Sequence, residues 1–159
     1  MKKFILSLAV CLCAAFSAQA QWTVGARAGS GFQAQSSYHF GSENYVEGRL
    51  GMDWVGHGGY LAADFTALYM WNICTMDWTP SAGQWFFDAG CGVGLGGDVN
   101  YLRVGVAGSA RLGIKFNSAP VRLAVDWSPL IGPSFPYHAK AHFHQWGLCN
   151  LGISAVYCF

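Results

Sequence analysis

Three histidines near the end of the chain are the first residues whose types and spacing could do chemistry. On an extended segment His142 and His144 share a face, and His138 lies close by. Imidazole groups placed this way bind zinc and other transition metals. No carboxylate or cysteine lies close enough in sequence to complete a site. We therefore expect a polar loop and no bound metal or other cofactor, with these three histidines as weak candidate ligands.

A serine, a histidine and an aspartate are the candidates for a hydrolytic site. Ser128, His57 and Asp98 fall near one rim of the fold predicted below. A lipid-modifying enzyme would need a nucleophile and a base at such a rim. The spacing of the three residues matches no catalytic motif, and most protein surfaces supply such a trio. The sequence therefore predicts a protein that is not an enzyme.

The cysteines could form disulfides or act as small apolar groups. Four of the six lie after residue 20, namely Cys74, Cys91, Cys149 and Cys158. Alternation places Cys91 and Cys149 on an apolar face, where a thiol behaves as a small hydrophobic group. Cys74 and Cys158 lie near the ends of predicted strands that are not neighbours. A disulfide needs Cα atoms within about 7 Å of each other. A bridge between these two cysteines is therefore the less favoured alternative.

Ten charged residues share one face of alternating segments and could pair with one another. That face is otherwise rich in Gly, Ala and Ser, and its charges are balanced between cations and acids. The ten residues are Arg27, Glu47, Arg49, Asp53, Asp64, Asp88, Arg111, Lys115, Arg122 and Asp126. Charges enclosed in a protein must be paired. The pattern predicts a structural ion-pair network, with a path for protons or small ions as the alternative.

The elements that carry these residues alternate between apolar and polar positions with a period of two, which is typical of β-strands. Eight strands are predicted, over residues 22–29, 32–40, 45–55, 60–71, 85–96, 102–116, 121–127 and 151–159. A polar turn is expected over 72–84, and the longest irregular stretch over 128–146. The strands lie in sequence order and are joined by short turns. This organisation predicts an all-β, antiparallel, up-and-down barrel.

Two arrangements produce such strands, and they differ in which face points inward. A soluble calycin-like barrel or a sandwich buries the apolar face, whereas a transmembrane barrel turns it toward lipid. The second is favoured because small residues suit the crowded lumen of an eight-stranded barrel. Aromatic residues near strand ends suit an interfacial girdle, and they are Trp22, Phe40, Trp54, Trp71, Trp85, Phe116, Trp127 and Tyr157. We predict a transmembrane β-barrel whose polar lumen is filled by side chains.

The start of the chain indicates export. Lys2 and Lys3 precede the apolar run 4–16, and Ala18-Gln19-Ala20 is typical of a signal-peptidase site. We expect a signal peptide over 1–20 and an outer-membrane barrel domain over 21–159. Lys2 and Lys3 are among the nine Lys and Arg residues, so seven remain after residue 20, against eight Asp and Glu. This balance gives no indication of a nucleic-acid partner.

Several segments resemble a known family. They are "VGARAGSGF", "QWFFDAGCGVGLG", "VAGSARLGIKF", "PVRLAVDWSPLI" and the closing "LGISAVYCF". Together they resemble the small outer-membrane β-barrel domain, a porin-like family of Bacteroidota, over nearly all of 21–159. The architecture is also similar to that of OmpA- and OmpX-type barrels. The resemblance implies the bacterial outer membrane as the location, its lipids as partners, and insertion by the barrel-assembly machinery, which reads a C-terminal strand ending in Phe159.

The resemblance implies no settled activity, so function is inferred from organisation. If both termini are periplasmic, the loops near Gly31 and over 56–59, 96–101 and 128–146 face outside. The longest of these is the natural site for contact with other molecules. We expect a non-enzymatic protein with a role in envelope structure, adhesion or surface interaction through residues 128–146. The alternatives are a narrow, porin-like channel and an outer-membrane lipid-modifying enzyme.

Overall fold

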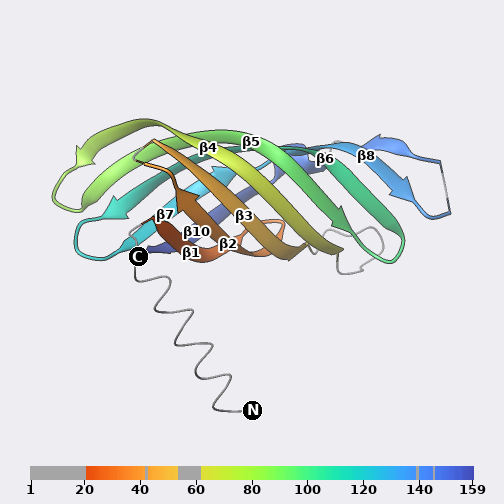
Figure 1. Cartoon of the computed structure of the whole chain (residues 1–159), viewed down its shortest axis with the longest axis horizontal. Helices are drawn as coiled ribbons and strands as arrows, with labels where there is room; N and C mark the ends of the chain where they lie inside the picture. Colours follow the sequence, from red (N-terminus) through yellow and green to blue (C-terminus); the bar gives the residue numbers. More distant parts are fainter. Residues whose placement is uncertain (1–20, 42, 54–61, 139, 145) are drawn as a thin grey trace, which may run out of the picture.

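The computed structural model describes residues 21–41, 43–53, 62–138, 140–144 and 146–159 (Figure 1). The expected signal peptide, 1–20, and His57 therefore lie outside the described residues. The described part is all-β apart from one short 3-10 turn, η1 (Trp146–Cys149). Its strands are β1 (Trp22–Ala28), β2 (Gly31–His39), β3 (Asn44–Asp53), β4 (Ala62–Thr79), β5 (Gly83–Gly97), β6 (Tyr101–Phe116), β7 (Val121–Trp127), β8 (Leu130–Pro136), β9 (His142–His144) and β10 (Leu151–Cys158).

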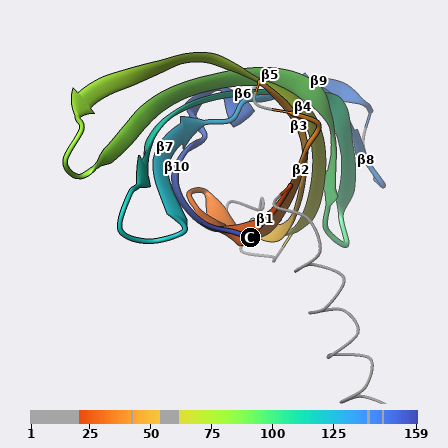
Figure 2. The same ribbon diagram turned by 60° about the vertical axis from the view of Figure 1, so that its left-hand side comes forward.

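Eight of these strands close into an antiparallel barrel. β1 to β7 pair in sequence order, β7 pairs with β10, and β10 pairs with β1 to complete the ring. Figure 2 shows the ring nearly end-on. The two remaining strands form an extension, in which β8 pairs with the first half of β6 and β9 pairs with β8. The prediction of an all-β, eight-stranded antiparallel barrel is confirmed.

The turn predicted over 72–84 is wrong, because most of it belongs to β4 and β5. These strands pair as far as Thr79 and Gly83, where the amide of Ala82 donates to the carbonyl of Thr79. The register shifts twice, between Asn72 and Cys74 and between Met76 and Thr79. A bulge inserts an extra residue and so interrupts the alternation of faces. Because of this interruption, the end of β4 does not show the period of two by which strands are predicted.

The irregular stretch predicted over 128–146 is also wrong, since it contains β8, β9 and η1. Pairing to β6 passes from β7 to β8 across a break at Ser128 and Pro129. At this break the amide of Gly108 donates to the carbonyl of Pro129 and keeps the two strands in contact. Proline lacks an amide hydrogen and is depleted in strands. The prolines in and beside β8 therefore led to the prediction of an irregular segment.

The barrel wall has apolar side chains on its outer face and charged side chains on its inner face, as the alternation predicted. Outward residues of every barrel strand include large exposed hydrophobic groups, among them Val24, Phe32, Leu50, Phe65, Val93, Val106, Leu123, Val125 and Ile153. The inward face holds the buried charged residues Arg27, Glu47, Arg49, Asp88, Arg111 and Asp126. This arrangement is the reverse of a barrel built around an apolar core. No helix in the described ranges is long and apolar enough to span a membrane.

One sector of the lumen is apolar, and glycines on β5 make room for it. Tyr45, Leu68, Met70 and Ala107 form a buried cluster against which Leu130 packs. The inward positions of β5 beside this cluster are glycines, and a Cβ atom at Gly92 would clash with the backbone oxygen of Ala67. Only a residue without a side chain fits that approach. Leu68 and Met70 pair in register with Gly92 and Gly90, so these large side chains lie beside a stretch of β5 that has no side chains.

Candidate functional site

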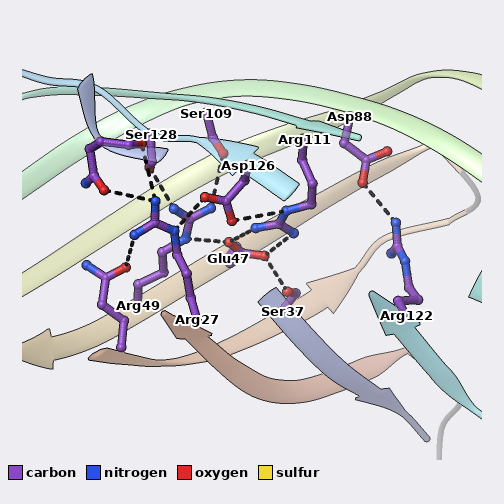
Figure 3. A network of polar contacts seen from close by, with 12 residues as sticks. Arg27, Ser37, Glu47, Arg49, Asp88, Ser109, Arg111, Arg122, Asp126 and Ser128 are labelled. Carbon is purple, nitrogen blue, oxygen red and sulfur yellow. Dashed lines mark hydrogen bonds and ion pairs between the residues drawn. The ribbon is translucent and has the colours of Figure 1, made fainter. Parts of the chain in front are cut away.

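The centre of the lumen is a carboxylate held by two arginines. The guanidinium of Arg111 donates from Nη1 to Oε2 of Glu47 at 2.9 Å and from Nη2 to Oε1 at 2.7 Å (Figure 3). Nε of Arg49 donates to the same Oε1 at 2.7 Å, and Oγ of Ser37 donates to Oε2 at 3.0 Å. The Glu47 side chain is 0% exposed. Fully buried and forked pairing of this kind is the strongest form of carboxylate contact.

Arg49 connects this centre to the break between β7 and β8. Its Nη1 donates to Oγ of Ser128 at 2.7 Å, and its Nη2 donates to Oγ of Ser109 at 3.1 Å. The Ser128 hydroxyl also lies 3.3 Å from the Gly108 carbonyl, to which it donates. Ser128 is therefore a buried structural residue whose hydroxyl accepts a hydrogen bond from Arg49. This environment differs from that of a nucleophile, which needs an adjacent base.

A second group of pairs lies toward the β10 side of the lumen. Nε of Arg27 donates to Oδ1 of Asp126 at 2.6 Å, and its Nη2 donates to Oδ1 of Asn150 at 3.0 Å. Nη1 of Arg27 donates to Gln33, whose amide in turn donates to the Asp64 carboxylate. The second Asp126 oxygen lies 3.9 Å from Nε of Arg111. These contacts join the two groups into one network.

A third group of contacts lies nearer the end that carries the C-terminus. Nη2 of Arg122 donates to Oδ2 of Asp88 at 2.9 Å. The same carboxylate accepts from the hydroxyl of Tyr45 at 2.7 Å and from Nδ2 of Asn72 at 2.7 Å. The Arg122 guanidinium carbon lies 3.9 Å from the ring centre of Phe86, in a cation–π contact. The Arg122 side chain is 13% exposed, so this pair is wetter than the centre.

The remaining predicted lumen charges lie outside these groups. Lys115 is exposed and stands directly opposite Arg122 in the β6–β7 register. Asp53 pairs through its backbone with Gly31, and its side chain lies outside the described part. Partners that the sequence reasoning missed are neutral polar residues, namely Gln33, Ser37, Tyr45, Ser109 and Asn150. Most of them occupy the same alternate positions along their strands as the inward charged residues, so the alternation could have identified them.

The other candidate chemistries find little support in the described geometry. His138 and His142 are exposed beyond β8, while the His144 side chain lies outside the described residues. No group of three His, Cys, Asp or Glu side chains in the described ranges suits a metal ion. Asp98 caps the β5–β6 turn, where its Oδ1 accepts from the amide of Asn100 at 2.6 Å.

The four cysteines of the described part are free thiols. Cys74, Cys91 and Cys149 are exposed, and Cys158 is half-buried. Cys91 lies on an outward position of β5, as the alternation indicates. Cys149 lies instead in η1, which is not part of the barrel wall. The prediction that alternation places Cys149 on the apolar face of the barrel is therefore wrong.

The β8–β9 hairpin projects at the end of the barrel opposite the C-terminus (Figure 1). Its large apolar side chains are exposed, with Phe135 at 45%, Tyr137 at 65% and Phe143 at 63%. Within the described residues β9 pairs with β8 alone, so its other edge is unpaired. An unpaired edge offers backbone donors and acceptors to another chain. The hairpin is thus a second candidate functional region, distinct from the lumen.

Comparison with known proteins adds no relative. No family model matches the chain, and no curated protein or solved structure does so either. Function is therefore inferred from the lumen, the exterior and the hairpin alone.

Proposed function

We propose that the chain is a non-enzymatic outer-membrane β-barrel whose sealed lumen supports a hairpin that contacts other molecules at the cell surface. The observation that carries this proposal is the inversion of the barrel. Arg27, Glu47 and Asp126 are 1%, 0% and 1% exposed inside, while Leu50 and Ile153 are both 64% exposed outside. An exterior of this kind is costly in water and favourable in hydrocarbon. The strand β10 (Leu151–Cys158), followed by Phe159, is the segment that assembly machinery would read.

The lumen supports a structural role over a channel. Salt-bridged guanidinium and carboxylate groups occupy its centre, and their side chains are at most 4% exposed. Eight-stranded barrels have an interior just wide enough for side chains to fill. Moving an ion past the Glu47 centre would require separating buried pairs, which costs about 3–5 kcal/mol for each partner removed. A closed barrel is the better account of these contacts.

The β8–β9 hairpin supports the surface role. It combines exposed aromatic side chains with an unpaired strand edge. Edges of this kind bind extended peptide segments by strand addition, in which main-chain hydrogen bonds give affinity. A protein partner that presents an extended segment is therefore the class of ligand we propose for this hairpin.

Flotation with lipid vesicles tests the membrane part of the proposal. The chain over 21–159, refolded from urea, is expected to float with vesicles and to change its electrophoretic migration on heating. A chain that is monodisperse in buffer without detergent, and that does not float, would overturn the proposal.

Planar-bilayer recording tests the sealed lumen. We expect no reproducible unitary current from the folded barrel, and a current that Glu47→Gln alters would support the channel instead.

A further inference from the structure

Two cations stand directly opposite each other at the mouth of the lumen, at the end of the barrel that carries the C-terminus. Lys115 and Arg122 form a register pair between β6 and β7, and both occupy inward positions of their strands. Directly opposite residues in a sheet have Cβ atoms about 4.5–5.5 Å apart, and like charges placed this way are destabilising. The buried lumen charges of the described part all take part in ion pairs of opposite charge. The contact between these two cations is therefore an exception that requires a physical reason.

The carboxylate that pairs with Arg122 does not neutralise both cations. Oδ2 of Asp88 accepts from Nη2 of Arg122 at 2.9 Å and from the Tyr45 hydroxyl, while Oδ1 accepts from Asn72. Both oxygens of Asp88 thus already have donors. Lys115 is exposed, and within the described ranges it forms no ion pair with an acid. Two cations therefore share one carboxylate, and the mouth carries an excess positive charge.

The guanidinium of Arg122 is held in place, but one of its donors is unused. Phe86 covers one face, with the guanidinium carbon 3.9 Å from the ring centre. Asp88 binds Nη2, away from the Glu47 centre (Figure 3). Nε of Arg122 is buried and has no hydrogen-bond partner in the part of the chain that the structure describes. Leaving a buried donor unpaired costs free energy, so such a donor indicates an acceptor that the chain itself does not supply.

We propose that Lys115 and Arg122 together bind the phosphate group of a soluble ligand at this mouth of the lumen. Arginine and lysine are the side chains that bind phosphate, the first through its fork of donors and the second as a point charge. Both side chains lie on the inner face of the barrel, so the ligand enters from the aqueous phase at this end and not from lipid around the wall. Gln84, which is exposed and opposite Lys115 in the β5–β6 register, adds a neutral donor.

A bound phosphate replaces the repulsion between the two cations with two attractions. Its charge of about −1.5 to −2 at neutral pH offsets the excess positive charge of the mouth. The site goes beyond the proposed surface role of the hairpin. It also leaves the lumen sealed, because the Glu47 centre lies deeper and is fully buried.

Titration of the folded barrel with inorganic phosphate tests this site. The protein is held in uncharged detergent micelles, so that no lipid headgroup supplies the anion, and ionic strength is kept constant with chloride. At about ten times its dissociation constant, a ligand that binds only the folded state should raise the urea midpoint by roughly 0.5 M. We expect this rise for the native chain and for the matched control Lys140→Gln, an exposed lysine between β8 and β9. We expect no rise for Lys115→Gln.

The same variant gives a second readout that a general effect of salt does not produce. In chloride alone, Lys115→Gln should raise the urea midpoint above that of the native chain, because it removes the like-charge contact with Arg122. In phosphate this difference should shrink or reverse. An equal response to phosphate in the native chain and in Lys115→Gln, or a lower midpoint for Lys115→Gln in chloride, would overturn the site. Flotation is measured on every chain: chains that float and give either of these results refute the phosphate site alone, whereas chains that do not float refute the membrane location.

Discussion

The centre of the lumen is buried and its carboxylate is fully hydrogen-bonded, whereas the β8–β9 hairpin has exposed aromatic side chains and an unpaired strand edge. Around Glu47 every oxygen has a nitrogen or hydroxyl donor, and water has almost no access. On the hairpin, Tyr137 and Phe143 are more than 60% exposed, and β9 has an unpaired edge in the described part. The Glu47 carboxylate is satisfied within the chain, whereas the free edge of β9 is not. The contrast indicates that stability resides in the lumen and recognition at the hairpin.

The largest test of this contrast removes the central carboxylate. Glu47→Gln leaves Arg49 and Arg111 buried without their anion, and breaking a buried pair costs about 3–5 kcal/mol. We expect a lower urea midpoint for unfolding in detergent micelles, followed by tryptophan fluorescence. Glu43→Gln, at an exposed position in the β2–β3 turn, is the matched control and should leave the midpoint unchanged. Equal midpoints for the two variants would mean that the lumen network does not hold the barrel together.

The next test addresses the apolar sector of the lumen. Leu68 is 2% exposed inside the cluster with Met70 and Tyr45. Leu68→Ala leaves a cavity against the glycines of β5, and substitutions of this kind cost about 2–5 kcal/mol. Leu50→Ala, which shortens an outward side chain, should cost much less. A cost for Leu50→Ala as large as that for Leu68→Ala would contradict a packed lumen.

The sequence predicts the polar lumen only where apolar and polar residues alternate along a strand with a period of two. Parity placed Arg27, Glu47 and Arg111 on one face, and the closed barrel follows from the strands that carry them. Parity also places Leu68 and Met70 inward with Asp64, whereas their apolar residue type predicts the outward face. Their burial depends on Gly92 and Gly90 of β5, which pair with Leu68 and Met70 across the β4–β5 hairpin.

Bulges and prolines limited the prediction in two other places. The double shift in β4 broke the alternation, and the prolines of β8 gave it the composition of a loop. Both segments form strands because β5 and β6 provide long partners for pairing. Ion-pair partners were harder still to predict, since Arg27 and Asp126 are 99 positions apart.

A smaller effect is expected at the end of the barrel that carries the C-terminus. Arg122→Ala removes one donor from Asp88, which keeps its contacts with Tyr45 and Asn72. The group is 13% exposed, so water compensates part of the loss. A hydrogen bond to a charged group contributes about 1.5–3 kcal/mol, and we expect the lower part of that range. The urea midpoint should fall clearly below that of Lys140→Ala, whose side chain is exposed; equal midpoints would place Arg122 outside the network.

The smallest effect on stability, and the largest on binding, is expected at the hairpin. Phe143→Ser removes a ring that is 63% exposed, so the free energy of unfolding should change by less than about 0.5 kcal/mol. Adhesion of cells that display the protein should nevertheless fall, because an exposed aromatic side chain is a typical anchor for a partner. Ile153→Ser, at an outward position of β10, is the control for loss of an exposed apolar group. If Phe143→Ser destabilises the barrel as much as Leu68→Ala does, the hairpin belongs to the folding unit, and the division between a stabilising lumen and a recognising hairpin fails.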